Sequence, residues 1–469
     1  MTISLKMVLR NLEFLVSSKE GILPQELIKL GKFDKERNVL AILPYKFWEF
    51  LELVNKLKIP IKNPLEFLDL RLPEESLHFD YELRDYQRDI CEEIAKNEFK
   101  AVIQLPTGAG KTIIALKIIH DLKLRTLIVV PTIELLSQWE KKVLKGLNIS
   151  SSLVGIYGGG RKDVKDITIA TYQGASKEVF LKKAVLYFGL IIFDEVHHLP
   201  SPVFSEIARR LIAPYRIGLT AFLDLDENKM RSLQDLVGPI IKFEEIDHLI
   251  QRGYLADYEY KLIKVKMNDA ERQKYRKLMR VYVDYIRYDI LPEYPWVRKK
   301  EDIFKIISKE AVSDPFAKKA IKALKMAKEI ALFPKEKLLR LEELLEKHRN
   351  DKVIIFTRHI RVASIISYLF GIPLITSLTK KELRAKIFEL FEEGKISKIV
   401  SAEALDEGVD IPDANVCIII SGRGSKRQLI QRIGRVLRPK EGKKAIIYEL
   451  VTVRTLDEKL WRKRRSLYY

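Results

Sequence analysis

Residues 104–112 read Gln104-Leu105-Pro106-Thr107-Gly108-Ala109-Gly110-Lys111-Thr112. The apolar run Ala101-Val102-Ile103 precedes this stretch and Ile113-Ile114-Ala115-Leu116 follows it, which predicts a strand, a loop and a helix. Glycines in such a loop let backbone N–H groups close around phosphate oxygens, and the helix N-terminus adds partial positive charge. Lys111 would reach the outer phosphates, and the hydroxyl of Thr112 would bind Mg²⁺.

One position departs from the full phosphate-loop pattern G-x4-G-K-[ST], because Leu105 stands where its first glycine would be. The remaining segment still predicts a nucleotide site, since it joins a strand to a helix. The alternative is a glycine turn that carries a lysine by chance. The motifs that follow in the chain argue against that alternative.

Composition narrows the class of protein. The chain has 469 residues, enough for about three domains, and a net charge of +20, which favours a polyanionic partner, nucleic acid before membrane surface. No apolar run approaches the roughly 18 residues of a membrane span, and residues 1–16 do not resemble a signal peptide. We therefore expect no membrane association, and a cytoplasmic protein in a prokaryote or archaeon (nuclear only in a eukaryote). Cys91 and Cys417 are expected to be buried small hydrophobic residues.

The pattern along the chain predicts four segments. Residues 1–75 form a small α+β domain in which Leu5, Leu9, Leu12 and Leu15 have helical spacing, and the aromatic residues 45–50 are either core or, less favoured, a base-stacking surface. Residues 76–245 and 337–469 alternate short apolar strands with helices, which indicates two α/β domains with parallel sheets. Residues 246–336 form a linker and a helical basic insertion; its stretch 261–330 holds 19 Lys and Arg against 10 Asp and Glu, a net of +9.

Two further motifs carry chemistry. The apolar run 190–193 leads directly into Asp194-Glu195, and adjacent carboxylates at the end of a buried strand are costly unless they bind a cation or polarise water. Asp194 would hold Mg²⁺, and Glu195 would position and deprotonate a water. Near the C-terminus, Arg432, Arg435 and Arg438 follow one another at helical spacing and can project guanidinium groups toward a nucleotide phosphate.

In this order the motifs resemble those of superfamily 2 helicases, over residues 80–450. The matching segments are Leu83-Arg84-Asp85-Tyr86-Gln87 (Q motif), Gly108–Thr112 (motif I), Pro131-Thr132 with Gln138-Trp139 (motif Ia), Ala170-Thr171-Tyr172-Gln173, Asp194–His197 (motif II), Gly218-Leu219-Thr220-Ala221 (motif III), Ile355-Phe356-Thr357-Arg358 (motif IV), Glu407–Pro412 (motif V) and Gln431–Arg438 (motif VI). The resemblance implies two RecA-like domains with ATP between them, flanked by the N-terminal domain and a helical thumb.

The resemblance also implies a role for each matched residue. Catalytic roles fall to Lys111, Asp194, Glu195, Gln431, Arg435 and Arg438, with Arg435 and Arg438 as arginine fingers. Nucleotide-binding roles fall to Arg84, Gln87 (adenine), Leu105, Pro106, Thr107, Gly108, Ala109, Gly110, Lys111, Thr112 and Asp410, and metal-binding roles to Thr112 and Asp194. Coupling roles fall to His197, Thr220 and Ala221, and DNA-binding roles to Thr132, Arg161, Thr171, Gln173 and Arg358, with Lys274 and Arg276 on the thumb.

Within the superfamily the chain resembles the XPB branch in its archaeal form, by Asp194-Glu195-Val196-His197-His198-Leu199-Pro200 and by the Gly158-Gly159-Gly160 turn. This resemblance implies a 3′–5′ DNA helicase or translocase that uses ATP and Mg²⁺ on single-stranded or forked DNA in nucleotide excision repair. It also implies a damage-recognition role for residues 1–75 and a protein partner, possibly a nuclease.

One departure from the XPB pattern favours translocation over strong unwinding. XPB relatives carry Arg-Glu-Asp after motif III, whereas this chain reads Leu225-Asp226-Glu227. Two other functions stay open on the sequence. The chain is alternatively an RNA-directed or double-strand translocase, or a DNA-binding scaffold that recruits a nuclease under control of ATP.

Overall fold

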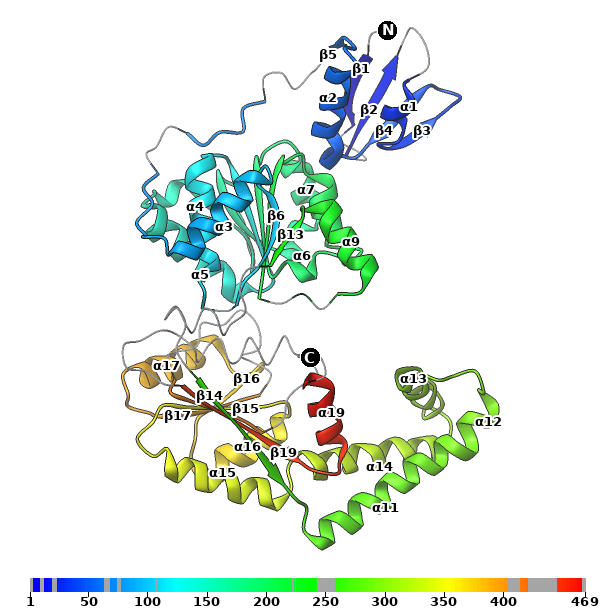
Figure 1. Ribbon diagram of the computed structural model, residues 1–469, viewed down its shortest axis with the longest axis vertical. Coiled ribbons are helices and arrows are strands. Elements are labelled where there is room, and N and C mark those ends of the chain that lie inside the picture. The colour runs from blue at the N-terminus through cyan, green and yellow to red at the C-terminus, as the bar shows by residue number, and fades with distance from the viewer. Residues whose placement is uncertain are drawn as a thin grey trace. The chain divides into compact units, whose positions relative to one another are not determined.

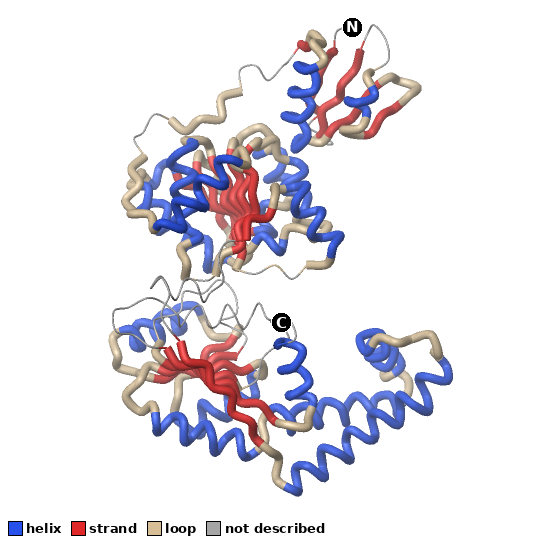
Figure 2. Tube along the Cα trace, in the orientation of Figure 1, coloured by secondary structure: helices blue, strands red, loops and turns tan. Residues whose placement is uncertain are grey.

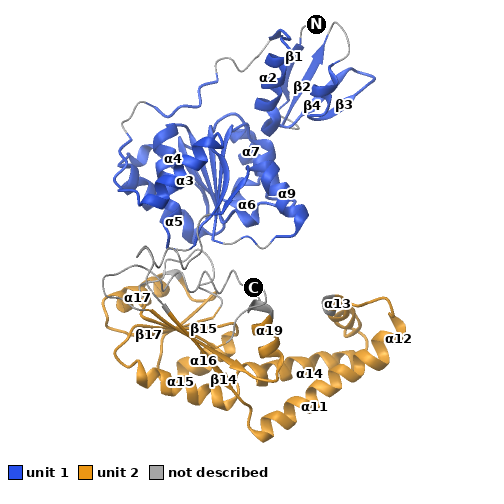
Figure 3. Cartoon of the chain, viewed as in Figure 1, with its two compact units in different colours: residues 1–249 blue, residues 250–469 orange. Residues whose placement is uncertain are grey.

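The computed structural model describes residues 3–8, 12–18, 23–62, 68–73, 77–106, 108–221, 223, 225–242, 258–402, 414–420 and 445–465. The chain divides into two compact units, Met1–Leu249 and Ile250–Tyr469 (Figure 3). Each unit is built around its own sheet with helices packed against it, and the first unit carries a further small sheet. Among the described residues, no helix is both long enough and apolar enough to cross a lipid bilayer.

The small N-terminal sheet has five strands in the order β3-β4-β2-β1-β5. Its elements are β1 (Ile3–Val8), β2 (Glu13–Ser18), α1 (Gln25–Ile28), β3 (Lys32–Asp34), β4 (Val39–Ile42), α2 (Phe47–Lys56) and β5 (Ile61–Lys62). The helix expected from the leucine spacing is therefore wrong. Ile3 and Leu5 of β1, and Phe14 and Val16 of β2, alternate with more exposed residues, so the period of two decides the structure.

The N-terminal aromatic cluster belongs to a core. Phe47 and Phe50 of α2 are buried, and the indole of Trp48 donates a hydrogen bond to the carbonyl of Ile212 at 2.7 Å. Tyr45 donates to the carboxylate of Asp235 at 3.2 Å. Because Ile212 and Asp235 lie in the following domain, the N-terminal domain packs against it, and the interpretation of these aromatic residues as core is confirmed.

The large sheet of the first unit has eight strands in the order β13-β6-β12-β11-β7-β10-β8-β9. Its strands are β6 (Lys100–Gln104), β7 (Thr126–Val130), β8 (Val154–Gly158), β9 (Arg161–Lys162), β10 (Ile167–Thr171), β11 (Leu190–Asp194), β12 (Tyr215–Thr220) and β13 (Ile240–Lys242). Its helices are α3 (Asp85–Lys96), α4 (Lys111–Leu122), α5 (Ile133–Leu147), α6 (Tyr172–Ala175), α7 (Glu178–Ala184), α8 (Ser205–Arg210) and α9 (Glu227–Leu236). All pairs except β8 with β9 are parallel, as the alternating pattern predicted.

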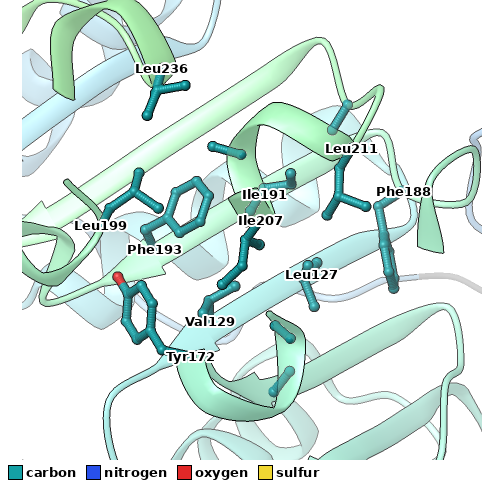
Figure 4. Close-up of a cluster of buried hydrophobic side chains, with 14 of the residues drawn as sticks. Leu127, Val129, Tyr172, Phe188, Ile191, Phe193, Leu199, Ile207, Leu211 and Leu236 are labelled. Atoms are coloured by element: carbon teal, nitrogen blue, oxygen red, sulfur yellow. The ribbon is translucent and has the colours of Figure 1, made fainter. Parts of the chain in front are cut away.

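Helices cover this sheet on its two faces, with α3 and α4 on one side and α7 and α9 on the other (Figure 1). Figure 4 shows how one face is filled: Leu127 and Val129 of β7 and Ile191 and Phe193 of β11 meet side chains that come from the helices. Burial on both faces explains why these strands read as continuous apolar runs.

The sheet of the second unit has six parallel strands in the order β14-β19-β18-β15-β17-β16 (Figure 2). The strands are β14 (Tyr258–Val265), β15 (Val353–Thr357), β16 (Leu374–Thr376), β17 (Lys398–Ala402), β18 (Val416–Ile419) and β19 (Ala445–Thr452). The helices packed with them are α15 (Lys335–Lys347), α16 (Ile360–Phe370), α17 (Lys381–Glu392) and α19 (Leu456–Arg465). Since β14 pairs with β19, the segment 258–265 belongs to this sheet and not to the linker in which the sequence analysis placed it.

The helical insertion lies between β14 and β15. It consists of α11 (Asp269–Tyr285), a π-helical turn (Ile286–Ile290), α12 (Leu291–Glu293), α13 (Lys300–Glu310) and α14 (Pro315–Leu332). Tyr285, Ile290, Ile303 and Ile307 form its own small core with two alanines of α14. The prediction of a helical insertion is confirmed, and Lys274 and Arg276 of α11 are exposed on it.

Candidate functional site

The loop between β6 and α4 has the backbone of a phosphate cradle. Gly108 and Gly110 have φ of 86° and 84°, the left-handed region that glycine adopts without strain. A Cβ on Gly110 would also lie 2.3 Å from the side-chain nitrogen of Gln87, so only glycine fits there. Lys111 is the first residue of α4, and its ammonium group donates to the carbonyls of Leu105 and Pro106 at 2.9 and 3.3 Å. The loop thus gathers a cation and a helix N-terminus at one point.

Residues of the Q motif lie directly behind this loop. The hydroxyl of Tyr86 donates to the carbonyl of Ala109 at 2.7 Å, and the amide nitrogen of Gln87 donates to the same carbonyl at 3.2 Å. The side-chain oxygen of Gln87 accepts from the backbone N–H of Arg84 at 3.0 Å. Gln87 is buried, so in this structure its amide fixes the phosphate loop to the start of α3. The adenine-reading role remains a proposal that these contacts do not support.

The acidic pair stands at the end of β11. Asp194 is the last residue of the strand; its Oδ1 accepts from the backbone N–H of Glu195 at 3.0 Å, and its Oδ2 accepts from the indole of Trp139 at 2.8 Å. Glu195 has φ of 50°, a left-handed conformation that costs a residue with a side chain about 1–2 kcal/mol. Strain of this kind is kept where the surrounding structure needs a particular side-chain direction, which marks the turn as a functional candidate.

Three strands bring the candidate residues to one edge of the sheet. In the pairing register Asp194 lies beside Leu219 of β12, and Leu219 lies beside Ile103 of β6. The carboxyl ends of these parallel strands therefore align, and the phosphate loop, Asp194 and motif III emerge at the same edge. That edge is where ligands bind in open α/β sheets.

His197 links the acidic pair to motif III. Its Nδ1 lies 3.4 Å from the carboxylate of Glu195 and 3.3 Å from the hydroxyl of Thr220. His197 and Thr220 are both buried, as is Ala221, which follows the end of β12. Of the three predicted coupling residues, His197 therefore contacts Glu195, Thr220 contacts His197, and Ala221 directly follows Thr220.

Four predicted DNA contacts of the first unit line a single groove of about 510 Å³: Thr132, Arg161, Thr171 and Gln173. Lys162 and Lys177 add positive charge to its lining. The two threonines also cap helices, because Thr132 Oγ1 accepts from the N–H of Leu135 and Thr171 Oγ1 accepts from the N–H of Gly174. Arg161 lies 3.5 Å from the carboxylate of Glu140, an exposed pair that contributes little energy.

In the second unit, the predicted contacts lie on neighbouring elements at the root of the helical insertion. Arg358 follows β15 and is exposed. Lys274 of α11 lines a cavity of about 420 Å³ together with His359 and Arg361, the N-cap residue and a first-turn residue of α16, which follows motif IV. Burial, and then the nearby charge of Arg358, lowers the pKa of Lys328 on α14, so several cations gather there.

Five predicted site residues lie outside the described residues: Thr107, Asp410, Gln431, Arg435 and Arg438. Their roles stay predictions from the motif resemblance. Two residues that contact Asp194, Trp139 and Tyr172, were not among the predicted site residues. Trp139 lies in motif Ia and Tyr172 in the matched segment 170–173, and no sequence signal pairs either of them with an aspartate far along the chain.

Comparison with known proteins identifies the family. The family model described as "Type III restriction enzyme, res subunit" matches residues 80–225, and "Helicase conserved C-terminal domain" matches residues 336–440. A protein of Sulfurisphaera tokodaii described as "DNA 3'-5' translocase XPB2" is 37% identical over 93% of this chain and 95% of its own length. The chain belongs to the XPB family of superfamily 2 helicases. The family membership that the motifs predicted is confirmed.

A second relative and a solved structure are also similar to this chain. "Putative DNA 3'-5' helicase Rad25" of Halobacterium salinarum is 30% identical over 81% of this chain and 56% of its own length. Among solved structures, the helicase domain of Pyrococcus furiosus Hef aligns with a TM-score of 0.56 at 22% identity, over 82% of this chain and 98% of that one. This likeness supports the fold, two RecA-like domains, and the predicted fold class is confirmed.

The segment that departs from the XPB pattern, Leu225-Asp226-Glu227, has a structural role in this chain. Asp226, within Leu225-Asp226-Glu227, accepts a hydrogen bond from the N–H of Lys229 at 2.9 Å and caps α9. Aspartate is among the preferred residues at a helix N-cap. The segment that in XPB relatives carries Arg-Glu-Asp thus begins a helix in this chain.

Proposed function

We propose that this chain is an ATP-dependent 3′–5′ DNA translocase of the XPB type, which opens DNA during nucleotide excision repair. The observation that carries the proposal is the shared edge of the first sheet. There the phosphate loop, the Asp194-Glu195 pair and the coupling residues emerge together, next to a basic groove that holds four predicted DNA contacts. Family membership supports the reaction, because the relative from Sulfurisphaera tokodaii is described as a DNA 3′–5′ translocase.

The proposed roles follow from chemistry at the sheet edge. Lys111 and the N-terminus of α4 bind the phosphates of ATP, and Glu195 orients and deprotonates the attacking water. Gln431, Arg435 and Arg438 complete the site by resemblance. Phosphoryl transfer needs placement and neutralisation of charge more than covalent help, and these residues supply both.

Mg²⁺ fits the oxygen donors of the site. Each carboxylate oxygen of Asp194 accepts one hydrogen bond from the protein, which leaves lone pairs for a cation. Thr112 offers a hydroxyl in the first turn of α4. Mg²⁺ prefers such oxygen ligands together with substrate phosphates. Bound there, it would neutralise phosphate charge.

DNA, single-stranded and forked, is the proposed polymer partner. Contacts to phosphates suffice for a motor that moves along a strand, so a groove with threonine, arginine and lysine side chains is chemically suited. A protein partner, possibly a nuclease, is proposed from the family alone. Damage recognition by residues 1–75 is proposed on the same ground.

Steady-state ATPase activity of the full chain tests the proposal. The rate is measured without polymer and with single-stranded DNA, forked DNA, duplex DNA or single-stranded RNA, and Lys111→Ala provides the blank for contaminating ATPases. We expect DNA to raise the rate by about 10-fold, within the usual range of coupling between two sites. Equal or greater stimulation by RNA would instead identify an RNA-directed motor. ATP turnover that no polymer changes would favour the scaffold function.

A second prediction concerns the affinity of the groove for DNA. The double variant Arg161→Ala, Lys162→Ala is expected to bind single-stranded DNA more weakly, because two phosphate contacts and their released counterions are lost. The slope of log affinity against log salt should become shallower by about 1.4, at roughly 0.7 per contact. Fluorescence anisotropy across a salt series measures this slope.

Lys96→Ala, which removes one positive charge instead of two, is a control for loss of charge away from the groove. Lys96 is an exposed lysine of α3 that lies near β13, at the opposite edge of the sheet from β8 and β9. Its loss should leave the slope unchanged. If the double variant and Lys96→Ala gave the same slope, the groove would not be a phosphate-binding surface.

A further inference from the structure

Helix α5 connects the groove to the acidic pair. Its N-cap residue Thr132 lines the groove, and Trp139, two turns further on, donates its indole N–H to Oδ2 of Asp194 at 2.8 Å. A separation of seven positions spans about 10 Å along a helix axis. Trp139 is 2% exposed, so the surrounding core holds its ring in place and fixes the direction in which the indole N–H points.

A second, shorter connection runs through α6. Its N-cap residue Thr171 also lines the groove, and the next residue, Tyr172, donates its hydroxyl to the backbone carbonyl of Asp194 at 3.1 Å. Tyr172 is buried with its ring 6.4 Å from that of Phe193, the strand residue before Asp194 (Figure 4). Two separate helices whose N-cap residues line the groove therefore each donate a hydrogen bond to the same aspartate, α5 to its carboxylate and α6 to its backbone carbonyl.

These contacts determine how the carboxylate of Asp194 is presented. The N–H of Glu195 holds Oδ1 and the indole of Trp139 holds Oδ2, so both oxygens are oriented by the protein. Partners that orient a metal-binding carboxylate tune its affinity for the metal. If binding of a phosphate in the groove shifted α5 or α6, it would therefore move a side chain that donates a hydrogen bond to Asp194, either Trp139 or Tyr172.

We infer that Trp139 and Tyr172 are positioning residues that couple nucleic-acid binding in the groove to the metal-binding carboxylate of Asp194. The inference rests on the proposed function, since it takes the groove as the polymer site and Asp194 as the Mg²⁺ ligand. It assigns the coupling to two hydrogen bonds, from an indole and from a phenol.

The test uses Trp139→Phe and Tyr172→Phe in the full chain, each of which keeps an aromatic ring and removes the donor. Matched controls are Trp48→Phe, which loses an indole bond of 2.7 Å to the carbonyl of Ile212, and Tyr187→Phe, which loses a phenol bond of 3.3 Å to Asp166. Both controls lie in the same unit and do not contact Asp194.

Two readouts are needed. The first is binding of the fluorescent nucleotide mant-ADP during a titration with MgCl₂, which involves no turnover. The second is the ratio of ATPase rates with and without single-stranded DNA. For Trp139→Phe we expect the half-saturating MgCl₂ concentration to rise about 10-fold and the DNA ratio to fall toward one. Tyr172→Phe should change both in the same direction.

The outcomes separate this inference from the proposed function. If the Mg²⁺ titration and the DNA ratio of both variants match those of the two controls, the inference is overturned while the motor function stands. If wild-type ATPase does not respond to DNA at all, the proposed function fails, and the Mg²⁺ titration alone still decides whether Trp139 positions Asp194. Should Trp139→Phe not fold, Tyr172→Phe carries the same test.

Discussion

Replacing Glu195 by glutamine is expected to lower the turnover number of the DNA-stimulated ATPase by about 10³-fold, within the range attributed to a positioned general base. The side chain keeps its size and its place beside His197, but it can no longer accept a proton from water. The loss corresponds to about 4 kcal/mol of activation free energy. Binding of mant-ADP, which needs the phosphate loop and Asp194, should stay close to wild type.

Glu206→Gln is a suitable control for this variant. Glu206 lies on α8 and pairs with Arg210, on the surface of the same unit, so the same chemical change there should leave turnover unaffected. Steady-state ATPase and equilibrium nucleotide binding are both measured. A Glu195→Gln enzyme that turned over at more than a tenth of the wild-type rate would show that another group activates the water.

The central strands could be predicted from sequence because their composition matches their burial. The run of β7, Thr126–Val130, is buried at every position, so its apolar residues mark it as a strand of a sheet covered on both faces. Edge strands gave no such signal. The edge strand β14 has the sequence YEYKLIKV, which mixes charged with apolar residues, and it pairs with one neighbour only, so it lacks the continuous apolar run that marks the central strands. The leucines of residues 5–15 fit helical spacing by chance, and cross-strand pairing overrode it.

The candidate site was predictable where chemistry is encoded in consecutive residues. Gly108 to Thr112 and Asp194-Glu195 are such runs, and the structure places them at one sheet edge. The contact between Trp139 and Asp194 joins residues 55 positions apart, and it depends on the packing of α5 against the sheet. The buried position of Gln87 behind the loop arises in the same way. Tertiary contacts of this kind have no local sequence signature.

Replacing Lys337 by methionine is expected to destabilise the second unit by about 3–5 kcal/mol, the usual cost of removing one partner of a buried ion pair. The ammonium group of Lys337 is completely buried on α15 and donates to the carboxylate of Asp457 and to the carbonyl of Ile420, both at 2.7 Å. Without it, the buried carboxylate of Asp457 would keep the backbone N–H of Thr452, at 2.9 Å, but would lose the opposite charge. Hydrogen exchange of amides in β18, which ends next to Ile420, measures the free energy of opening.

Two further variants separate charge from packing. Lys335→Met changes an exposed lysine of the same helix and should leave β18 protection unchanged. The double variant Lys337→Met, Asp457→Leu removes both charges, and apolar replacement of a buried pair is often neutral or stabilising, so it should recover most of the loss. A single variant as stable as Lys335→Met would contradict the prediction. Recovery in the double variant would show that Lys337 mainly compensates Asp457, whereas persistent loss would show that the bond to Ile420 holds the end of β18 to α15.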